Sequence, residues 1–477
     1  MVGVPGRSKG CSTCRRRKKG CDKKRPVCTQ CSSAGLECGG YERETIFLNH
    51  TQGTEAKAIP VVYQKGNQGR SEDVTAGVTD IVLPNGLAQT AYIEKYISIF
   101  LAKYLPAGRC LTTNRLRSSG DWIEIAHRLH TSDKATQLSL LSLGLFAAGE
   151  SQYAIQSYCF ALRKLQTTLS VPRRAQDNST LATCHILSLY EVFHGAEDNV
   201  LLQGSRWRSH LNGLVAVIEA RSPDAYQSGV SHQLFTEGRY SLLVAAIKDR
   251  HRFPLNTPEW RTIPWEKEPK SLMDKIYDIM ADLSEILADT DEMRRCDDPV
   301  QKTNLHGEVL RACWCLNENL QSWLTDVGPL TDFYDSNGVL NDPAGPSDML
   351  LAHMTIVYWA VCVILYSTLI SLHDPPLSEI PINIDPLPYL QGLAKALPYF
   401  WSPNAGLCGS NLAAWPWGIC LHAAYATPQR YSREITLLEQ FAWQQNGAIA
   451  VVRFLDSLQR TSAEPEMAKL DGRPGSK

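Results

Sequence analysis

Six cysteines within 28 residues constrain what the start of this 477-residue chain can fold into. They are Cys11, Cys14, Cys21, Cys28, Cys31 and Cys38. The unit Cys-x2-Cys-x6-Cys therefore occurs twice, and the loop between the two copies contains Pro26. A Cys-x2-Cys pair places two sulfurs on one tight turn, where both can bind the same metal ion, and four thiolates in a tetrahedron suit zinc. The spacing predicts a small metal-binding module.

Counting ligands indicates how six sulfurs can bind two zinc ions. Two separate four-sulfur sites would need eight sulfurs, so two of the six have to be shared. We expect two zinc ions per chain, with Cys11 and Cys28 bridging between them. The other ligands would be Cys14 and Cys21 on one ion and Cys31 and Cys38 on the other.

Two other uses of six cysteines stay open at this point. Three disulfides can also hold a small module together. They are typical of secreted proteins, however, and the start MVGVPGRSKG lacks the apolar core of a signal peptide. One mononuclear zinc site with two spare cysteines is the second alternative. We favour the two-zinc cluster over both.

The first forty residues are strongly basic, although the whole chain has a net charge of only −1. They contain ten Lys and Arg against two Asp and Glu, a net charge of +8, whereas the rest of the chain has a net charge of −9. Two zinc ions and six thiolates would carry about −2, which leaves this segment near +6. Such a concentration of positive charge is typical of a surface that binds nucleic-acid phosphates. A solvated charged face or an import signal is the alternative.

The segment from Gly10 to about Tyr41 resembles the fungal binuclear zinc cluster DNA-binding domain. The resemblance rests on all six cysteines, on the basic run RRRKK after the second cysteine, and on the proline two residues before the fourth. It implies that the basic helix after Cys14 enters the major groove of double-stranded DNA at a CGG half-site. Lys18 corresponds to the lysine that donates to the guanines, whose O6 and N7 atoms are acceptors. Further phosphate or base contacts would come from Arg15, Arg16, Arg17, Lys19 and Lys23.

Gly20, directly before Cys21, departs from the family pattern, in which a basic or other side chain usually stands at this position. A glycine would loosen the end of the reading helix and puts a backbone contact to a base there in doubt. It is also the one feature that favours a protein-interaction role over DNA binding.

Beyond this module the sequence predicts one large helical domain. Residues 50–85 are rich in Gly, Thr, Asn and Gln and have neither a sustained helical period nor a heptad run. We therefore expect a binuclear zinc-cluster module of two short helices at 1–40, a flexible linker at 41–88, a large all-α regulatory domain at 89–460 and a polar tail at 461–477.

Periodicity locates the helices of the expected regulatory domain. From Gln89, apolar pairs recur every four residues, beginning with Tyr92 and Ile93 and ending before Pro106. Further helices are expected over 121–130, 134–149, 151–169, 179–194, 205–221 and 231–249. Thr427-Pro428 predicts the start of a C-terminal helical region. The helix pair at 134–169, the segments WRSHLNGLVAVIEARSP and FTEGRYSLLVAAI, and the WPWGI segment resemble the second type of fungal-specific transcription factor domain.

Two apolar stretches of this domain have alternative interpretations. Apolar residues in 271–290 are spaced 4-3-4-3 over just over two heptads, which favours an internal core helix over a dimer seam. Met349 to Leu372 contains no Asp, Glu, Lys or Arg and is long enough to span a bilayer. It lacks flanking basic residues, so we favour a buried core helix here too.

Acidic residues and cysteines of the same domain also allow more than one role. The acidic residues interleaved with the 271–290 stretch form a solvated helix face or, less favoured, an acidic activation surface; they are Asp282, Glu285, Asp289, Asp291 and Glu292. Most of the nine further cysteines lie in apolar runs and are expected to be reduced core residues. Cys313 and Cys315 have no second ligand pair nearby, so we expect both in the core rather than on a metal.

The sequence contains no recognisable catalytic motif, since it lacks a glycine-rich phosphate loop and an H-E-x-x-H motif. We predict a nuclear, zinc-dependent, sequence-specific regulator of RNA polymerase II genes and no enzymatic activity. The resemblance implies control of a metabolic or secondary-metabolite gene set. The helical body would contact the transcription machinery and could form a homodimer, without a membrane partner. The alternatives are a corepressor or interaction protein that does not bind DNA itself, and an enzyme body joined to a DNA-binding module.

Overall fold

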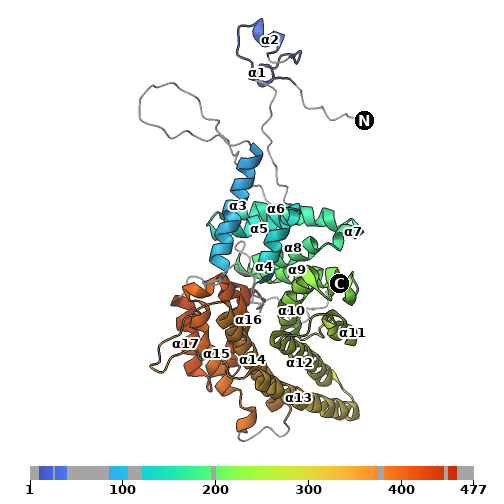
Figure 1. Cartoon of the computed structure of the whole chain (residues 1–477), viewed down its shortest axis with the longest axis vertical. Coiled ribbons are helices and arrows are strands. Elements are labelled where there is room, and N and C mark those ends of the chain that lie inside the picture. Colours follow the sequence, from blue (N-terminus) through green and yellow to red (C-terminus); the bar gives the residue numbers. More distant parts are fainter. Residues whose placement is uncertain are drawn as a thin grey trace, which may run out of the picture. The chain divides into compact units, whose positions relative to one another are not determined.

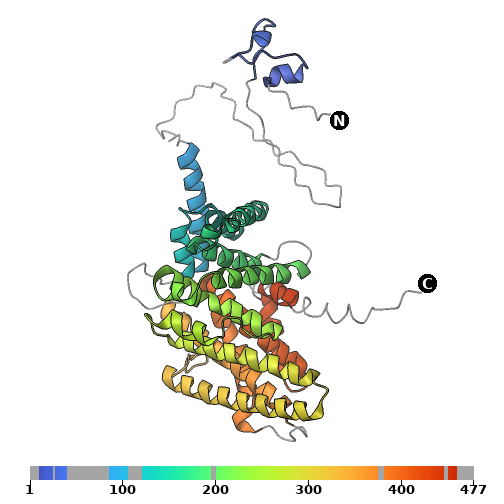
Figure 2. The same ribbon diagram turned by 90° about the vertical axis from the view of Figure 1, so that its right-hand side faces the viewer.

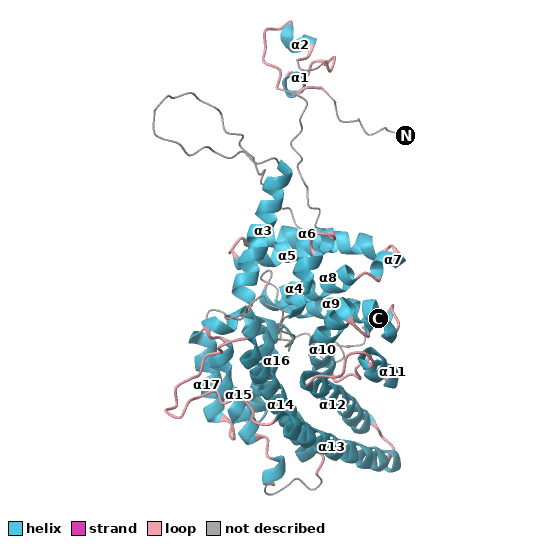
Figure 3. Ribbon diagram, viewed as in Figure 1, coloured by secondary structure: helices cyan, strands magenta, loops and turns pink. Residues whose placement is uncertain are grey.

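The computed structural model describes residues 10–24, 27–39, 85–105, 121–194, 200–373, 381–444 and 450–458. Contacts divide the chain into two compact units, Met1–Ile81 and Val82–Lys477. The regular elements of the described residues are helices, apart from one isolated bridge between Tyr334 and Leu340 (Figure 3). The expected tail lies outside the described residues, as does the expected linker except for its last four residues, which open the first helix of the second unit.

The first unit contains two short helices, as predicted: α1 (Ser12–Arg16) and α2 (Thr29–Ser32). Its core consists of sulfur. The fully buried residues of this core are Cys11, Cys14, Cys28 and Cys31, and the partly buried Cys21 and Cys38 pack against them. A segment this short cannot bury enough apolar surface to fold alone, so the sulfur cluster has to supply its stability.

The second unit is all-α, which confirms the predicted fold class. Its helices are α3 (Asn85–Tyr104), α4 (Asp121–Leu129), α5 (Lys134–Ala147), α6 (Ser151–Leu169), α7 (Pro172–Ala175), α8 (Asn178–Phe193), α9 (Val200–Glu219), α10 (Gly229–Asp249), α11 (Pro258–Thr262), α12 (Leu272–Arg295), α13 (Pro299–Val327), α14 (Pro346–Ser371), α15 (Leu387–Phe400), α16 (Gly406–Ala426) and α17 (Ser432–Gln444). A further helical stretch covers 450–458. Each helix expected between residues 121 and 249 is present, although α9 begins at Val200 rather than at 205.

The helices of the second unit pack in two groups that α10 joins. In Figures 1 and 2, α5, α6, α8 and α9 lie at one end of this unit and α12 to α15 at the other. Helix α10 contacts α8 and α9 in the first group and α12 in the second. The N-terminal half of α3 projects beyond its neighbours in both views, and the side chain of Tyr92 is accordingly exposed.

Helix α14 contains the apolar stretch that is long enough for a bilayer, and it packs inside the second unit. It contacts α12, α13, α15 and α16 (Figure 1). Among the described residues, α14 is the one helix long and apolar enough to cross a membrane, and 78% of its most apolar window is buried within the protein. Helix α12 is also internal, since Ile276 and Leu283 are fully buried. Both interpretations as core helices are therefore confirmed.

A glycine allows α16 to begin against the end of α3. Gly406 has a φ of +61°, a left-handed conformation that glycine adopts at little cost. A Cβ at this position would come 2.6 Å from the carbonyl oxygen of Tyr104. The absence of a side chain therefore permits the close approach of two segments that lie 300 residues apart in the chain.

The predicted start of the C-terminal helical region is wrong. Helix α17 begins at Ser432, whereas Thr427 is the C-cap residue of α16. The Thr427 carbonyl accepts the backbone N–H groups of Arg430 and Tyr431, which closes a turn between the two helices. Proline fixes a φ that suits a turn as well as a first helical position, so Thr427-Pro428 alone could not distinguish the two.

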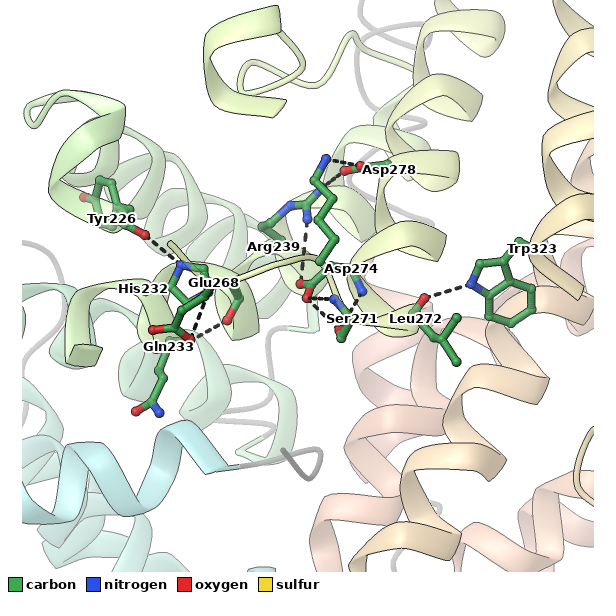
Figure 4. Close-up of polar contacts among 12 residues, drawn as sticks. Tyr226, His232, Gln233, Arg239, Glu268, Ser271, Leu272, Asp274, Asp278 and Trp323 are labelled. Atoms are coloured by element: carbon green, nitrogen blue, oxygen red, sulfur yellow. Dashed lines mark hydrogen bonds and ion pairs between the residues drawn. The ribbon is translucent and has the colours of Figure 1, made fainter. Parts of the chain in front are cut away.

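A buried ionic cluster joins α10 to the start of α12 (Figure 4). Arg239 on α10 is paired with Asp278 on α12, and its second nitrogen lies 3.9 Å from Asp274. Ser271 and Asp274 form a reciprocal capping box at the first turn of α12. At the same turn, Trp323 of α13 donates its indole N–H to the carbonyl of Leu272 at 2.8 Å. Three helices therefore meet at the N-terminus of α12.

The acidic residues of α12 are paired with three arginines that follow or lie close after α10. The separations are 2.7 Å for Arg250 and Asp291, 2.8 Å for Arg252 and Glu285, and 2.6 Å for Arg261 and Asp282. Arg252 also pairs with Asp289 and Glu292. Each of the five carboxylates on this face of α12 is therefore paired with one of three arginines, so the face is not an unpaired acidic surface.

The cysteines of the second unit largely follow the prediction, with one clear error. The eight that are described are all free, and five are buried: Cys184, Cys313, Cys362, Cys408 and Cys420. Cys315 is exposed, whereas the sequence predicted that it lies in the core with Cys313. Both residues lie on α13, and side chains two positions apart on a helix point to different faces, so only one of them can enter the core.

Candidate metal centre and nucleic-acid interface

The sulfurs of the first unit form two overlapping groups of four. One group is Cys11, Cys14, Cys21 and Cys28, and the other is Cys11, Cys28, Cys31 and Cys38. Within each group all four sulfurs lie within 4.8 Å of one another. The two shared residues are Cys11 and Cys28, the same pair that ligand counting assigned as bridges between two ions.

The distances between these sulfurs suit zinc and do not suit disulfides. The sulfur of Cys28 lies 3.6 Å from that of Cys11 and 3.6 Å from that of Cys14. A zinc–sulfur bond of about 2.3 Å puts two tetrahedral ligands about 3.8 Å apart. A disulfide needs about 2.05 Å, and all six cysteines are free. The six clustered cysteines are therefore consistent with two zinc ions.

Burial makes these thiols poor acids unless a cation is present. It raises the pKa of Cys14 to about 12 and also raises the pKa values of Cys28 and Cys31. A bound divalent ion reverses this effect, because a coordinating thiol loses its proton outright. The chemistry of the donor set thus favours two metal ions, which would supply the charge that stabilises six thiolates at this spacing.

The two halves of the repeat position their first cysteine in the same way. Cys28 is the N-cap residue of α2, and its sulfur accepts the backbone N–H of Cys31 at 3.4 Å. Cys11 precedes α1, and its sulfur accepts the backbone N–H of Cys14 at 3.3 Å. Each shared sulfur therefore lies at a helix N-terminus, where peptide N–H groups favour a thiolate.

The basic helix is shorter than the sequence predicted. Helix α1 ends at Arg16, so Arg17, Lys18 and Lys19 lie in the turn that follows it. Lys18 has a φ of 54°, and the backbone N–H of Lys19 donates to the carbonyl of Cys14 at 3.1 Å, which closes the helix as a Schellman motif does. A continuous helix would separate Cys14 from the cysteine seven residues later by about 10 Å. The chain has to leave the helix for that sulfur to reach the cluster.

The basic side chains proposed for DNA contact are exposed wherever they are described. The residues are Arg16, Arg17, Lys18, Lys19 and Lys23, whereas the side chain of Arg15 lies outside the described part of the chain. Gly20 stands four residues beyond the end of α1, so it does not loosen that helix. A Cβ at Gly20 would meet nothing within 4 Å, and the position therefore has no steric need for glycine.

Sequence reasoning missed the polar residues that tie the cluster together. Asp22 accepts the backbone N–H of Thr29 at 3.1 Å and thereby connects the basic loop to α2. Thr13 donates its hydroxyl to the carbonyl of Glu37 at 2.9 Å, and the backbone N–H of Gly39 donates to the Thr13 hydroxyl. These bonds hold the end of the second half against α1. Nothing in the local sequence pattern indicates them, because each joins residues at least seven positions apart.

Comparison with known families identifies two domains in the chain. Residues 9–45 match the fungal Zn(2)-Cys(6) binuclear cluster domain, and residues 99–246 match the fungal specific transcription factor domain. The chain therefore contains a binuclear zinc cluster domain and a fungal specific transcription factor domain, the second of them within the all-α unit.

Similarity to individual proteins is more limited. A protein of Emericella nidulans described as uncharacterized protein AN5342 is 25% identical to this chain over 117 residues. The match covers 24% of each protein, so the chain spans about a quarter of the length of this curated relative. No solved structure matches the chain.

A small polar cavity lies inside the second unit. Its lining includes His185, Glu237, Tyr277, His353 and Asn411, and its volume of about 40 Å³ has room for a few water molecules. A pocket for a drug-sized ligand usually measures several hundred Å³. In this structure the cavity is therefore a small polar space in the core rather than a formed effector pocket.

The cavity histidines are expected to make the second unit sensitive to acid. Burial lowers the pKa of His185 to about 4 and that of His353 to about 3, from an ordinary value of 6.5. Between pH 6.5 and pH 4 the unfolded chain therefore binds more protons than the folded chain, and the free energy of unfolding falls as the pH falls. His185 alone contributes a loss of roughly 2 kcal/mol between pH 7 and pH 5. Urea unfolding followed at several pH values measures this loss.

His185→Phe should reduce the pH dependence of the free energy of unfolding, because it removes the titrating group. The phenyl ring keeps an aromatic ring beside Trp122, whose ring centroid lies 5.4 Å from that of His185. The matched control is His251→Phe, at an exposed position of the same unit. An unchanged pH slope for His185→Phe would contradict the assignment of acid sensitivity to the cavity.

Proposed function

We propose that this protein is a nuclear regulator of RNA polymerase II genes that recognises specific DNA sequences through its zinc cluster. One observation carries the proposal. The chain that follows Cys14 presents exposed basic side chains, and it belongs to the unit that the two overlapping four-sulfur groups hold together. A cluster of this kind fixes the positions of its cations, and phosphate contacts at fixed positions are what set the register of a protein on DNA.

Each residue of the module has a role in this proposal. Cys11 and Cys28 bridge two zinc ions. The remaining ligands are Cys14 and Cys21 on one ion and Cys31 and Cys38 on the other. Lys18 donates to the guanines of a CGG half-site from the turn that closes α1. The phosphate or additional base contacts come from Arg15, Arg16, Arg17, Lys19 and Lys23.

The all-α domain supplies the regulatory half of the proposal. It receives signals, contacts the transcription machinery and forms a homodimer, and the genes controlled belong to a metabolic or secondary-metabolite set. The match of residues 99–246 to the fungal specific transcription factor domain supports a regulatory role for this part of the chain.

Selection from random duplex DNA tests the proposal with the full-length, zinc-loaded protein. Enrichment of CGG is the expected result, and two copies at a fixed spacing would add that the protein binds as a dimer. Failure to enrich any sequence, with two zinc ions bound in the cluster, would contradict the proposal and favour a corepressor or interaction protein that uses the cluster only as a scaffold.

Lys18→Ala and Lys23→Ala are expected to affect DNA binding differently. Both residues are exposed and both have a positive φ, 54° and 62°, so the two changes are made at matched backbone positions. Lys18→Ala should weaken the free energy of binding by about 1–3 kcal/mol on DNA with the selected site and by little on random DNA, because it removes a base contact. Lys23→Ala should weaken both equally and reduce the salt-dependence slope by about one. Equal losses on both DNAs for Lys18→Ala would exclude a base-reading role.

A further inference from the structure

A second group of metal-ligating side chains lies in the all-α unit, far in sequence from the cysteine cluster. It consists of Glu94 on α3, His127 in the last turn of α4, and His130 directly after α4. One ligand atom from each residue lies within 4.8 Å of the other two. The two imidazole rings are nearly parallel, with centroids 5.0 Å apart and an interplanar angle of 7°. The spacing His-x2-His places both rings on one face of the helix end.

The hydrogen bonds of His130 point to a cation between its ring and Glu94. Nδ1 of His130 is in contact with the backbone carbonyl of His127, and a carbonyl can only accept, so Nδ1 is the donor. In the neutral ring, Nε2 then carries a lone pair, and it faces the Glu94 carboxylate at 2.8 Å. Two acceptors at this distance repel each other unless a proton or a metal ion lies between them.

A metal ion accounts for more of the geometry than a proton does. The second oxygen of Glu94 lies 3.8 Å from Nε2 of His127, beyond hydrogen-bond distance but within the reach of two ligands of one ion. A proton on His130 accounts for the 2.8 Å contact, whereas an ion shared by all three side chains would also bind His127. The bond from His130 Nδ1 to a carbonyl is also the contact that usually orients a metal-binding imidazole.

We propose that Glu94, His127 and His130 bind a divalent transition metal ion, with zinc as the best match. Two imidazoles and one carboxylate are a common zinc donor set, and they leave a fourth position for water or another ligand. His130 is almost fully buried, with 3% of its side chain exposed, whereas His127 and Glu94 are 36% and 41% exposed. One firmly held ligand and two accessible ones allow an ion to enter from solvent.

The ion would connect the first helix of the all-α unit to the helix after it. Glu94 lies at the middle of α3, and the half of this helix that precedes it projects beyond the neighbouring helices in Figures 1 and 2. Metal binding therefore fastens this part of α3 to the end of α4. This inference does not depend on the cysteine cluster, so it can be tested separately from DNA binding.

Metal content of the full-length protein provides the test. After equilibration with excess zinc and gel filtration, the wild-type protein is expected to hold three zinc ions per chain. Glu94→Gln and His127→Gln should each hold two, because both side chains are exposed enough to be replaced without disturbing the core. The matched control His251→Gln, at an exposed histidine outside the group, should hold three. Cys28→Ala should keep the ion bound to α3 and α4 while it loses those of the cluster.

A cobalt absorption spectrum and a hydrogen-exchange measurement complete the test. Cobalt(II) added to protein that holds zinc in the cysteine cluster only should give d–d absorption without a thiolate charge-transfer band, since its ligands are nitrogen and oxygen. Hydrogen exchange in α3 should slow in the presence of zinc for the wild type and not for Glu94→Gln. A wild-type content of two ions with no further cobalt uptake would overturn the proposal and leave an imidazolium–carboxylate ion pair between His130 and Glu94. Uptake that is equal in the wild type and in both variants would also overturn it.

Discussion

Replacing Cys28 with alanine is expected to release both zinc ions of the cluster and to abolish DNA binding. Cys28 is buried and belongs to both four-sulfur groups, so each ion would lose a ligand. Metal binding at sites of this kind contributes on the order of 10 kcal/mol or more to folding, far more than a unit with a sulfur core can recover from other contacts. The first unit should therefore be unfolded in this variant. Zinc content and a binding assay with the selected DNA measure the two losses.

Two further cysteine substitutions make this prediction specific to the shared sulfur. Cys21 belongs to only one of the two four-sulfur groups, so Cys21→Ala leaves the second group complete. This variant should therefore lose one zinc ion rather than two. Cys315→Ala removes an exposed cysteine of the second unit and should change neither zinc content nor DNA binding. Retention of two cluster ions by Cys28→Ala would show that this sulfur is not shared. Loss of both ions from Cys21→Ala would show that the two sites cannot form independently.

The cysteine pattern predicted the cluster well because metal-ligand spacing is a local property. Two copies of Cys-x2-Cys-x6-Cys were enough to predict two short helices and to pair the sulfurs in groups of four. The extent of the basic helix could not be predicted from its composition, because RRRKK has a good helix propensity. The need to return Cys21 to the cluster overrides that propensity and places Lys18 in a left-handed turn. A tertiary constraint therefore decided the position of the residue proposed to read the bases.

In the second unit, periodicity predicted which segments are helices but not which side chains meet. The apolar stripe of α12 correctly indicated a core helix, whereas its acidic face gave no sign of the arginines that pair with it. Those arginines follow α10 and reach α12 only through the fold. The His-x2-His spacing is likewise visible in the sequence, but Glu94 lies more than thirty residues before it and approaches only because α3 and α4 both pack on α5. The contacts between helices could thus not be predicted from this single sequence.

Arg239→Ala is expected to destabilise the all-α unit by about 3–5 kcal/mol, the usual cost of removing one partner from a buried ion pair. The Arg239 side chain is 6% exposed and those of Asp274 and Asp278 are 4% and 19% exposed, so water cannot replace the lost guanidinium easily. The guanidinium also lies over the Trp265 ring, 5.3 Å from its centroid, and this packing is lost as well. Lys270 still pairs with Asp278, which leaves Asp274 as the carboxylate that loses most. Urea unfolding of the full-length protein should show the transition of this unit at a lower denaturant concentration.

Arg252→Ala is the matched control, because it also removes an arginine that pairs with acidic residues of α12. Its side chain is 52% exposed, and its partners Glu285 and Glu292 are 28% and 58% exposed, so the pairs are screened by solvent. Exposed pairs of this kind contribute roughly 0–1 kcal/mol, and the urea midpoint should therefore shift little. Arg239→Lys should fall between the two alanine variants, since an ammonium keeps the charge but cannot stack on Trp265 or hold two carboxylates with a planar group. Equal midpoints for Arg239→Ala and Arg252→Ala would mean that burial does not determine the strength of these pairs, and that the contact between α10 and α12 depends on apolar packing alone.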